Sequence, residues 1–290
     1  MQVTRGAAPL RLAASVVSIG TFDGVHRGHR AVLAALRAAG RAHGLPTVLL
    51  TFDPHPRAFL QPQSAPRMIS TVDDRIALLA DSNAVDHCLV LPFDRALSEA
   101  SAEDFVRGWL LARLGMRRLV VGANFRCGRG RQGDIDYLGQ LGEANGYTVN
   151  PVPLRASDAA VRCSSTEARR LIQSGDVRAA AALLARPHEI RARVVARQPA
   201  RASGAAEIRL PDGICLPPAG QYAGAVRAQV GAARWSQALV HLTETDGMAR
   251  VFSDAEFAPM PGSAVSVRFF GAAQAKPGGP DGRSRSHERE

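Results

Sequence analysis

One stretch near the start of the chain constrains the fold most: Gly20-Thr21-Phe22-Asp23-Gly24-Val25-His26-Arg27-Gly28-His29. It follows an apolar run typical of a buried strand, Ser15–Ile19, and it precedes a helix expected from about Arg30 to His43. A strand, a glycine-containing turn and a helix direct free backbone N–H groups at a phosphate. His26 and His29 are three residues apart at the helix start, so both side chains can reach one anion. The stretch predicts a nucleotide-phosphate site.

Two histidines are also found as zinc ligands or as unrelated surface residues. A zinc site needs further nitrogen or sulfur ligands, and neither a Cys-x-x-Cys pair nor a second histidine cluster supplies them. Surface histidines leave the glycines and the strand–turn–helix setting unexplained. Gly28 lacks the Cβ that would keep phosphate oxygens away from the backbone, which favours phosphate binding.

The composition is that of a globular protein, with 46% hydrophobic and 21% charged residues among 290, enough for two modest domains or one large one. No run approaches the roughly 18 to 20 apolar residues that span a bilayer, and no secretory signal is visible. We therefore expect a cytoplasmic protein without a membrane partner. The four cysteines lack paired spacing and indicate reduced thiols; they are Cys88, Cys127, Cys163 and Cys215.

The net charge of +10 suggests a polyanionic partner. Lys276 is the only lysine, the arginines are spread along the chain, and aromatic residues make up only 5%. Because no basic run with interleaved aromatics occurs, we expect no nucleic-acid partner. The charge suits a small polyanionic substrate such as ATP, although a compositional bias toward arginine explains it equally well.

Strands alternate with helices as far as Pro187, which predicts a parallel α/β sheet with helices on both faces. Further strands are expected at Thr47–Thr51, Asp86–Leu91, Arg118–Gly122 and Thr148–Val152, and helices begin at Thr71, Ser101, Ser164 and Asp176. The unusual loops all follow strands, at residues 21–29, 52–56 and 123–134. They should meet at one cleft beyond the carboxyl ends of the strands.

The texture changes after Pro187, where short β-type runs alternate with Pro and Gly turns. We expect strands at Ile190–Ala196, Tyr222–Val230, Ala238–Thr243 and Ala264–Phe270. That pattern predicts a small antiparallel barrel. The expected division is an unassigned N-terminal arm (1–14), a Rossmann-like α/β domain (15–187), a barrel (188–272) and a disordered tail (273–290).

Four motifs in order resemble those of the prokaryotic FAD synthetases, the bifunctional riboflavin kinase/FMN adenylyltransferases. They are the stretch 20–29, Thr51-Phe52-Asp53-Pro54-His55-Pro56, the segment 121–128 continuing to Gly133-Asp134, and Ser164-Ser165-Thr166-Glu167-Ala168-Arg169 with the residues behind it to Pro187. The resemblance covers about residues 15 to 190, the adenylyltransferase module of that family.

The resemblance implies that FMN phosphate attacks the α-phosphate of ATP, with Mg²⁺ bridging phosphate oxygens, to give FAD and pyrophosphate. The implied catalytic residues are His26, His29 and Arg169. The implied nucleotide-binding residues are Gly20, Thr21, Phe22, Asp23, Gly24, Gly28, Ser164, Ser165 and Thr166. The implied flavin-binding residues are Phe52, Asp53, Pro54, His55, Pro56, Asn124, Arg126, Cys127 and Asp134.

Several of these residues have a purely structural alternative. Asp23 either braces its turn or binds a metal, and His55 between two prolines is more often a structural residue than a base. Ser164 and Thr166 are also good helix caps, Asn124 can cap its own turn, and Arg169 can be a salt-bridged helix residue. The metal ligands and the oligomeric state stay open.

Two departures from the family pattern shape the functional expectation. Cys127 stands where the third motif usually has an aromatic residue, and a thiol cannot cover a flavin ring as a phenyl group does. In the barrel, Leu216-Pro217-Pro218-Ala219-Gly220-Gln221-Tyr222 still resembles the kinase module. The Gly-x-Pro-Thr-Ala-Asn segment before it is replaced by residues 199–204, and neither Glu244 nor Glu256 has the context of a catalytic base.

We therefore expect FMN adenylyltransferase activity without riboflavin kinase activity. The first alternative is a nucleotidyltransferase that uses ATP or CTP with a different phosphorylated metabolite. The second is a catalytically inactive sensor of flavin or nucleotide.

Overall fold

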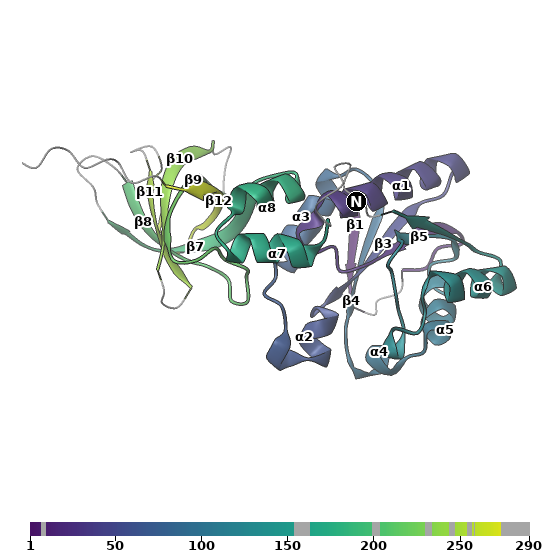
Figure 1. Ribbon diagram of the computed structural model, residues 1–290. Helices are drawn as coiled ribbons and strands as arrows, with labels where there is room; N and C mark the ends of the chain where they lie inside the picture. Colours follow the sequence, from purple (N-terminus) through teal and green to yellow (C-terminus); the bar gives the residue numbers. More distant parts are fainter. Residues whose placement is uncertain are drawn as a thin grey trace, which may run out of the picture.

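The N-terminal part of the chain forms a sheet of six strands with helices packed around it (Figure 1). In this computed structural model the described residues are 1–6, 10–153, 163–198, 204–229, 234–243, 247–253, 257 and 259–273. The strands are β1 (Gln2–Arg5), β2 (Ser15–Ile19), β3 (Thr47–Asp53), β4 (His87–Pro92), β5 (Met116–Gly122) and β6 (Thr148–Val152). All neighbours are parallel, in the order β1-β4-β3-β2-β5-β6. The predicted parallel α/β sheet is confirmed.

Both faces of this sheet are apolar. Successive residues of a strand point to opposite sides, and in the central strands apolar residues point to both. Val17 packs in one cluster with Leu110 and Leu138, while Val16 packs in another with Val32 and Leu36. The helical elements of this domain are α1 (Arg27–His43), η1 (Asp23–Val25), α2 (Pro56–Leu60), η2 (Pro62–Ser64), α3 (Val72–Asp81), α4 (Arg95–Glu99), α5 (Ala102–Phe105), the π-helical η3 (Val106–Leu111), η4 (Arg129–Arg131) and α6 (Ile135–Asn145). Helices therefore cover both faces, as the fully buried strands require.

The helix boundaries follow from local capping chemistry. The Thr71 side chain accepts the Asp74 N–H at the start of α3, and the Ser101 side chain accepts the Asp104 N–H at the start of α5. Gly44 and Gly146 close α1 and α6 with left-handed backbone. These ends match the sequence expectation. Helix α1 begins three residues earlier than expected, at Arg27, because His26 is its N-cap.

The N-terminal segment that the sequence left as an unassigned arm is in part a strand of the sheet. Residues 2–5 pair with His87–Val90, so β1 is the edge strand beside β4. Leu12 N–H donates to Arg113 O at 3.0 Å. The carbonyl of Leu12 lies 2.5 Å from where a Cβ on Gly115 would stand, so only glycine fits there. A four-residue edge strand is too short to show a period, so its partner decides its structure.

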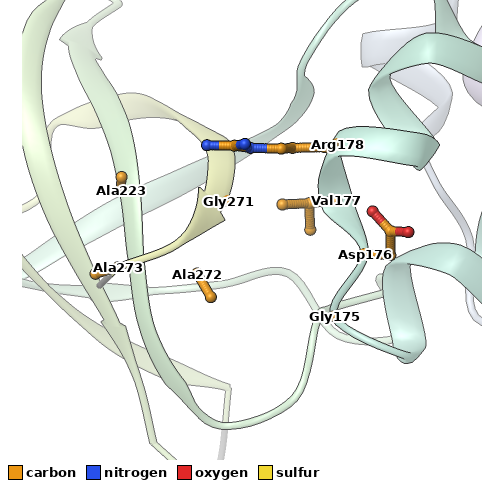
Figure 2. A pocket seen from close by; sticks show the side chains of 8 residues that line it. All are labelled: Gly175, Asp176, Val177, Arg178, Ala223, Gly271, Ala272 and Ala273. Atoms are coloured by element: carbon orange, nitrogen blue, oxygen red, sulfur yellow. The ribbon is translucent and has the colours of Figure 1, made fainter. Parts of the chain in front are cut away.

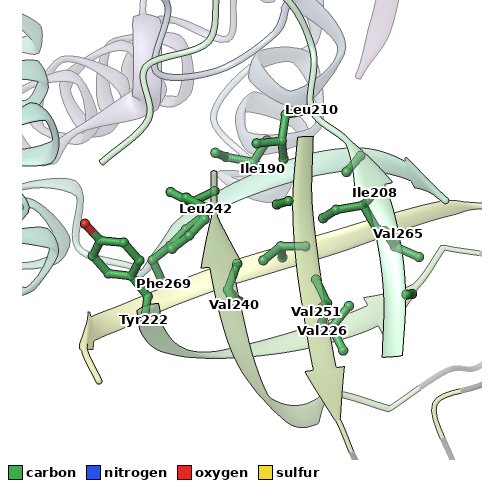
Figure 3. Packing of buried hydrophobic residues seen from close by; sticks show 14 of the residues in the cluster. Ile190, Ile208, Leu210, Tyr222, Val226, Val240, Leu242, Val251, Val265 and Phe269 are labelled. Carbon is green, nitrogen blue, oxygen red and sulfur yellow. The ribbon is translucent and has the colours of Figure 1, made fainter. Parts of the chain in front are cut away.

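The C-terminal part is a closed antiparallel barrel of six strands in the order β10-β11-β8-β7-β12-β9. Its strands are β7 (His188–Gln198), β8 (Gly204–Arg209), β9 (Gly220–Ala228), β10 (Ser236–Leu242), β11 (Met248–Ser253) and β12 (Ala264–Ala272). The predicted barrel is confirmed, although β8 and β11 were not expected. Figure 3 shows the interior, where Val226, Val240 and Phe269 fill the centre. Of the predicted tail (273–290), Ala273 is described and its N–H donates to Gln221 O at 2.8 Å. Residues 274–290 and 199–203 lie outside the described residues, as do Glu244 and Glu256.

Two helices, α7 (Ser165–Gln173) and α8 (Val177–Leu184), lie between the sheet and the barrel (Figure 1). Val177 belongs to the barrel core. A second connection joins Met68 to the barrel: Met68 N–H donates to Gly213 O, and Cys215 N–H donates to Met68 O, both at 2.7 Å. The Arg191 guanidinium of β7 also pairs with Asp74 of α3 at 2.6 Å. The barrel is therefore tied to the segment that precedes α3.

A cavity of about 490 Å³ opens where α8 meets the barrel (Figure 2). Its lining is mostly glycine and alanine, with Asp176 and Arg178 as its charged side chains. Among the described residues no helix is long and apolar enough to cross a membrane, and all four cysteines are free thiols.

Candidate active site

The loop after β2 is held in a conformation that few residues adopt. Phe22, Gly24 and Val25 all have positive φ, at 48°, 74° and 41°. This is unusual for a β-branched residue such as Val25, which is nonetheless fully buried. A Cβ on Gly24 would lie 2.8 Å from the Ile69 side chain, so this position requires glycine. Because such strain persists only where the surroundings impose it, the loop is a candidate functional element.

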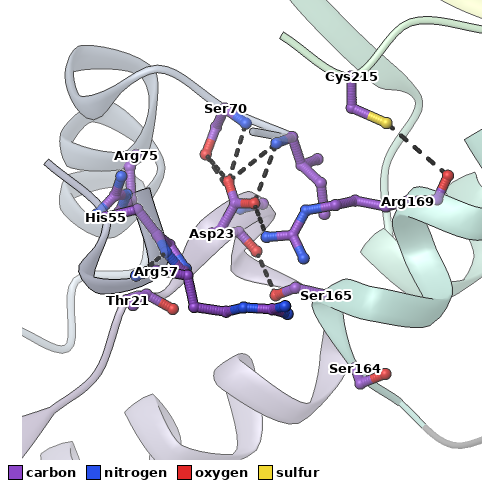
Figure 4. Close-up of polar contacts among 12 residues, drawn as sticks. Thr21, Asp23, His55, Arg57, Ser70, Arg75, Ser164, Ser165, Arg169 and Cys215 are labelled. Atoms are coloured by element: carbon purple, nitrogen blue, oxygen red, sulfur yellow. Dashed lines mark hydrogen bonds and ion pairs between the residues drawn. The ribbon is translucent and has the colours of Figure 1, made fainter. Parts of the chain in front are cut away.

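Asp23 is the centre of a buried polar network that holds the loop in place (Figure 4). Its carboxylate accepts the N–H groups of Ile69 and Ser70 at 3.0–3.1 Å and the Ser70 hydroxyl at 3.1 Å. It also pairs with the Arg169 guanidinium at 2.7 Å, and both side chains are buried or nearly so, at 0% and 11% exposed. Asp23 was expected either to brace its turn or to bind a metal, and these contacts favour the first role.

His26 and His29 lie together at the N-terminus of α1, with their rings stacked at 3.6 Å. The His29 N–H donates to Nδ1 of His26 at 3.3 Å, so this nitrogen is unprotonated. Nδ1 of His29 is buried and has no hydrogen-bond partner among the described residues. The predicted pair is thus in contact, and one of its ring nitrogens lacks, within the described part of the chain, the partner that a buried polar atom normally has.

Both histidines are neutral at pH 7. The pKa of His26 is lowered to about 4, mainly by burial and also by Arg169 and Arg186, while Asp23 opposes the shift. Burial also holds the pKa of His29 well below its usual value, and the neighbouring His26, Arg75 and Arg169 act in the same direction. A neutral imidazole donates a hydrogen bond to a phosphate oxygen, and a bound anion raises its pKa.

The start of α7 meets the start of α1, as the resemblance of the motifs implied. Cys163 Sγ accepts the Gly28 N–H at 3.1 Å and lies 3.7 Å from Nδ1 of His26. The Ser165 hydroxyl donates to Asp23 O at 3.0 Å. Residues 20–29 and 163–169, far apart in the chain, therefore form one site. The Gly28 N–H was expected to bind a phosphate, whereas here it donates to the Cys163 thiol.

The other two hydroxyl residues of the motif at 164–169 have different surroundings. The Ser164 side chain caps α7 by accepting the Glu167 N–H at 3.2 Å, which is the structural alternative. Thr166 is exposed on the helix. Two helix N-termini with their positive dipole ends thus converge beside the histidine pair.

The loop after β3 carries an aromatic surface. Phe52 packs edge-on against Phe93 at 5.7 Å, and Phe59 of α2 packs against the same ring at 5.8 Å while staying 40% exposed. Nδ1 of His55 accepts the Arg57 N–H at 3.1 Å and caps α2. Burial lowers the pKa of His55 to about 4, and Arg169 adds to the effect. Nδ1 of His55 is thus engaged in a helix cap. Asp53 and Pro54 are exposed, and Pro56 is the first residue of α2.

The loop after β5 is held mainly by its own residues. Asp134 caps α6 by accepting the Tyr137 N–H at 3.1 Å, and it pairs with Arg126 at 3.2 Å. Cys127 exchanges two backbone hydrogen bonds with Gly133 at 3.0 Å. Its thiol packs in the apolar cluster that also contains Phe52 and Phe125, and burial raises the pKa of this thiol to about 12. Asn124 is exposed.

Sequence reasoning missed several residues of this site. Ile69 and Ser70, which hold Asp23, come from a segment with no recognisable motif. Phe93 follows β4 directly, at the carboxyl edge of the sheet where ligand-binding residues gather. That position could have identified it as a site residue. Arg75 lies in a helix whose pattern gave no sign of function.

Comparisons with known proteins place the chain in a defined family. The family model described as FAD synthetase matches residues 9–167. A "Bifunctional riboflavin kinase/FMN adenylyltransferase" of Pseudomonas fluorescens is 39% identical over 197 residues, 67% of this chain and 62% of that protein. The protein of the same description from Escherichia coli (strain K12) is 34% identical over 198 residues, 67% of this chain and 63% of that protein. The match thus spans less than two thirds of these relatives.

A solved structure shares the whole architecture. The crystal structure titled "Macrolide-efflux Protein from Streptococcus pneumoniae" superimposes with a TM-score of 0.80 and covers 98% of this chain and 94% of that one. Its sequence is 23% identical, so the likeness concerns the fold. It extends through both the sheet and the barrel.

Proposed function

Because this chain belongs to the FAD synthetase family, we propose that it transfers the adenylyl group of ATP to FMN. A phosphate oxygen of FMN forms a bond to the α-phosphorus of ATP. The bond from that phosphorus to the oxygen bridging the β-phosphorus breaks, and pyrophosphate leaves with the electron pair. The products are FAD and pyrophosphate. Such a transfer depends on positioning and charge stabilisation more than on covalent help from the protein.

The observation that carries the proposal is the contact between residues 20–29 and 163–169, which brings His26, His29 and Arg169 into one site. The stacked histidines lie at the N-terminus of α1, and Arg169 approaches from α7 through its ion pair with Asp23. We propose that the histidines donate hydrogen bonds to phosphate oxygens and stabilise the charge that develops on them. Arg169 holds the leaving pyrophosphate, for which a guanidinium fork is suited.

Mg²⁺ enters this reaction as part of the nucleotide substrate. Within the part of the chain that the structure describes, no group of three or more His, Cys, Asp or Glu side chains gathers to hold a metal ion. Phosphate oxygens of ATP are hard ligands that Mg²⁺ prefers, so we propose that the triphosphate supplies most of its coordination.

The aromatic surface of Phe52, Phe59 and Phe93 supports a flavin as the acceptor. The exposed face of Phe59 offers apolar area to a planar ring, and Asn124 offers an amide to its polar edge. The thiol of Cys127 packs inside the protein, so its replacement of an aromatic residue does not remove this surface.

We further propose that the barrel does not phosphorylate riboflavin. The family's Gly-x-Pro-Thr-Ala-Asn segment is absent from the sequence, and with it the Thr and Asn oxygens that would bind Mg²⁺–ATP. The retained Leu216–Tyr222 motif has a structural use, since the Tyr222 hydroxyl donates to Pro218 O at 2.9 Å and its ring packs edge-on against Phe269. The relatives named above are described as bifunctional, so this is a difference to be tested.

Pyrophosphate release tests the proposal directly. The purified chain is incubated with Mg²⁺ and either ATP or CTP, against FMN and a panel of other phosphorylated acceptors, and FAD is identified by chromatography. Release with ATP and FMN together, and with neither alone, is the expected result. Release with a different acceptor or with CTP would assign another nucleotidyl transfer. Nucleotide binding without release from any pair would indicate a sensor.

A further inference from the structure

A buried arginine near the site has no carboxylate within ion-pair distance among the described residues. Arg75 of α3 is 2% exposed. Its Nη1 donates to the Thr51 hydroxyl at 2.9 Å and to Phe52 O at 3.2 Å, both neutral groups. Its Nε is buried and unpaired among the described residues. Figure 4 shows the side chain beside His55.

Such an arrangement costs free energy in the folded protein. A buried cation loses its hydration, and a well-placed counter-charge normally repays part of that cost. Asp23 is already engaged by Arg169 at 2.7 Å, and Asp53 is exposed on its loop. Burial accordingly lowers the pKa of Arg75, while Asp23 and Asp53 oppose that shift. Because a guanidinium stays protonated at neutral pH, the fold keeps an incompletely neutralised charge here.

The position of this charge links the two halves of the site. Arg75 binds the carboxyl end of β3, and Thr51, which it contacts, donates in turn to Thr21 O at 3.3 Å. Burial is the main cause of the lowered pKa of His29, on the triphosphate side, and of His55, on the acceptor side, and the Arg75 charge adds to both shifts. Arg75 therefore acts on the region between the histidine pair and the loop at residues 52–56.

We propose that Arg75 is a positioning residue whose fixed charge draws the acceptor phosphate to the α-phosphate and offsets the repulsion between these two anions. This inference rests on the proposed function. Two anions at contact repel, and a positive charge in a poorly hydrated setting counters that repulsion far better than one in water. Arg75 needs no direct contact with either phosphate for this effect.

A purely structural role makes different predictions. If Arg75 only tethers α3 to β3, its removal lowers stability and weakens all ligands alike. If it is held for its charge, a neutral side chain of similar length removes a desolvation cost, so the free protein keeps its stability. The phosphate-bearing ligand then loses affinity selectively.

The test compares Arg75→Met, which removes the charge, with Arg75→Lys, which keeps it. The control is Arg95→Met, because Arg95 is 86% exposed and pairs only with Glu99 in the described structure. Thermal unfolding is measured without ligand. Fluorescence titrations compare FMN with riboflavin, which differ by the phosphate, and inorganic tripolyphosphate is tested by its stabilisation against unfolding.

For Arg75→Met we expect FMN affinity to fall about tenfold or more, riboflavin affinity to change less than about twofold, and the melting temperature to stay unchanged or rise. Arg75→Lys should recover most of the FMN affinity, and Arg95→Met should match the wild type. Equal loss of both flavins, or a clear drop in melting temperature with both Arg75 variants, would overturn the inference.

The design separates this inference from the proposed function. If the wild type binds neither flavin, the proposed acceptor is wrong, and tripolyphosphate then decides the role of Arg75. Stabilisation by tripolyphosphate that is lost in Arg75→Met supports a charge held for phosphate. Stabilisation that persists in the variant, or that is absent from the wild type, refutes it.

Discussion

The Asp23 network allows one perturbation to be worked out in detail. In Asp23→Asn the amide oxygen can replace Oδ1, which accepts the Ile69 N–H, the Ser70 N–H and the Ser70 hydroxyl. The amide NH₂ then occupies the place of Oδ2, where it faces the Ile69 N–H and the Arg169 guanidinium, donor against donor. Arg169 is only 11% exposed, so water cannot replace the lost partner.

The expected cost follows from these contacts. Removing one partner of a buried ion pair destabilises a protein by about 3–5 kcal/mol, because the other charge is left uncompensated. We expect the free energy of unfolding to fall by that amount. The ion pair of Arg5 and Asp73 is the matched control, because its side chains are 52% and 70% exposed. Asp73→Asn should cost less than about 1 kcal/mol.

Urea unfolding followed by circular dichroism at pH 7 measures both variants. The double variant Asp23→Asn/Arg169→Met completes a cycle, in which the second change should cost much less than it does in the wild type. Equal costs for Asp23→Asn and Asp73→Asn, or simple additivity in the cycle, would show that the pair does not brace the loop.

Three further predictions concern the site and the barrel. His29→Ala should lower turnover about a hundredfold while flavin affinity stays close to that of the wild type, and equal loss of both would contradict its place beside the triphosphate. Riboflavin with ATP should yield no FMN by chromatography, and detectable phosphorylation would show that the barrel is an active kinase. Burial lowers the pKa of His188 to about 4 from its ordinary 6.5, so the unfolded chain takes up the proton first on acidification. The contribution of His188 to stability should therefore be complete above pH 6.5 and be lost by up to ~3 kcal/mol toward pH 4. His188→Gln should make the pH dependence of urea unfolding shallower by that amount, and an unchanged slope would refute this.

The sequence by itself determined the elements whose causes are local. The apolar runs at Ser15–Ile19 and Thr47–Thr51 specify buried strands, and Thr71, Ser101 and Gly146 specify helix ends through their own hydrogen bonds or backbone freedom. The alternation of strands and helices then leaves few arrangements open, and the loops that carry unusual residues must share one edge of a parallel sheet. The contact between residues 20–29 and 163–169 was expected from the resemblance of their motifs to one family, and not from that rule.

Elements without a local cause needed the tertiary structure. Strand β1 is defined by its pairing with β4, and strands β8 and β11 by closure of the barrel, since runs of four to six residues are too short to show a clear period. The sequence also could not decide which motif residues make structural hydrogen bonds and which stay free for a ligand. Asp23 braces its loop, Ser164 and His55 cap helices, and the Gly28 amide meets Cys163.

The physical reason is that the type of a residue fixes which bonds its side chain can form, while the tertiary structure decides which partners lie close enough to form them. The spacing of His26 and His29 is set by one helix turn and is readable in the chain. Arg75 is buried against neutral groups instead of a carboxylate, and those surroundings exist only once α3 packs on β3. The sequence thus determined where phosphate chemistry is expected, and the tertiary structure decided which charges remain available for it.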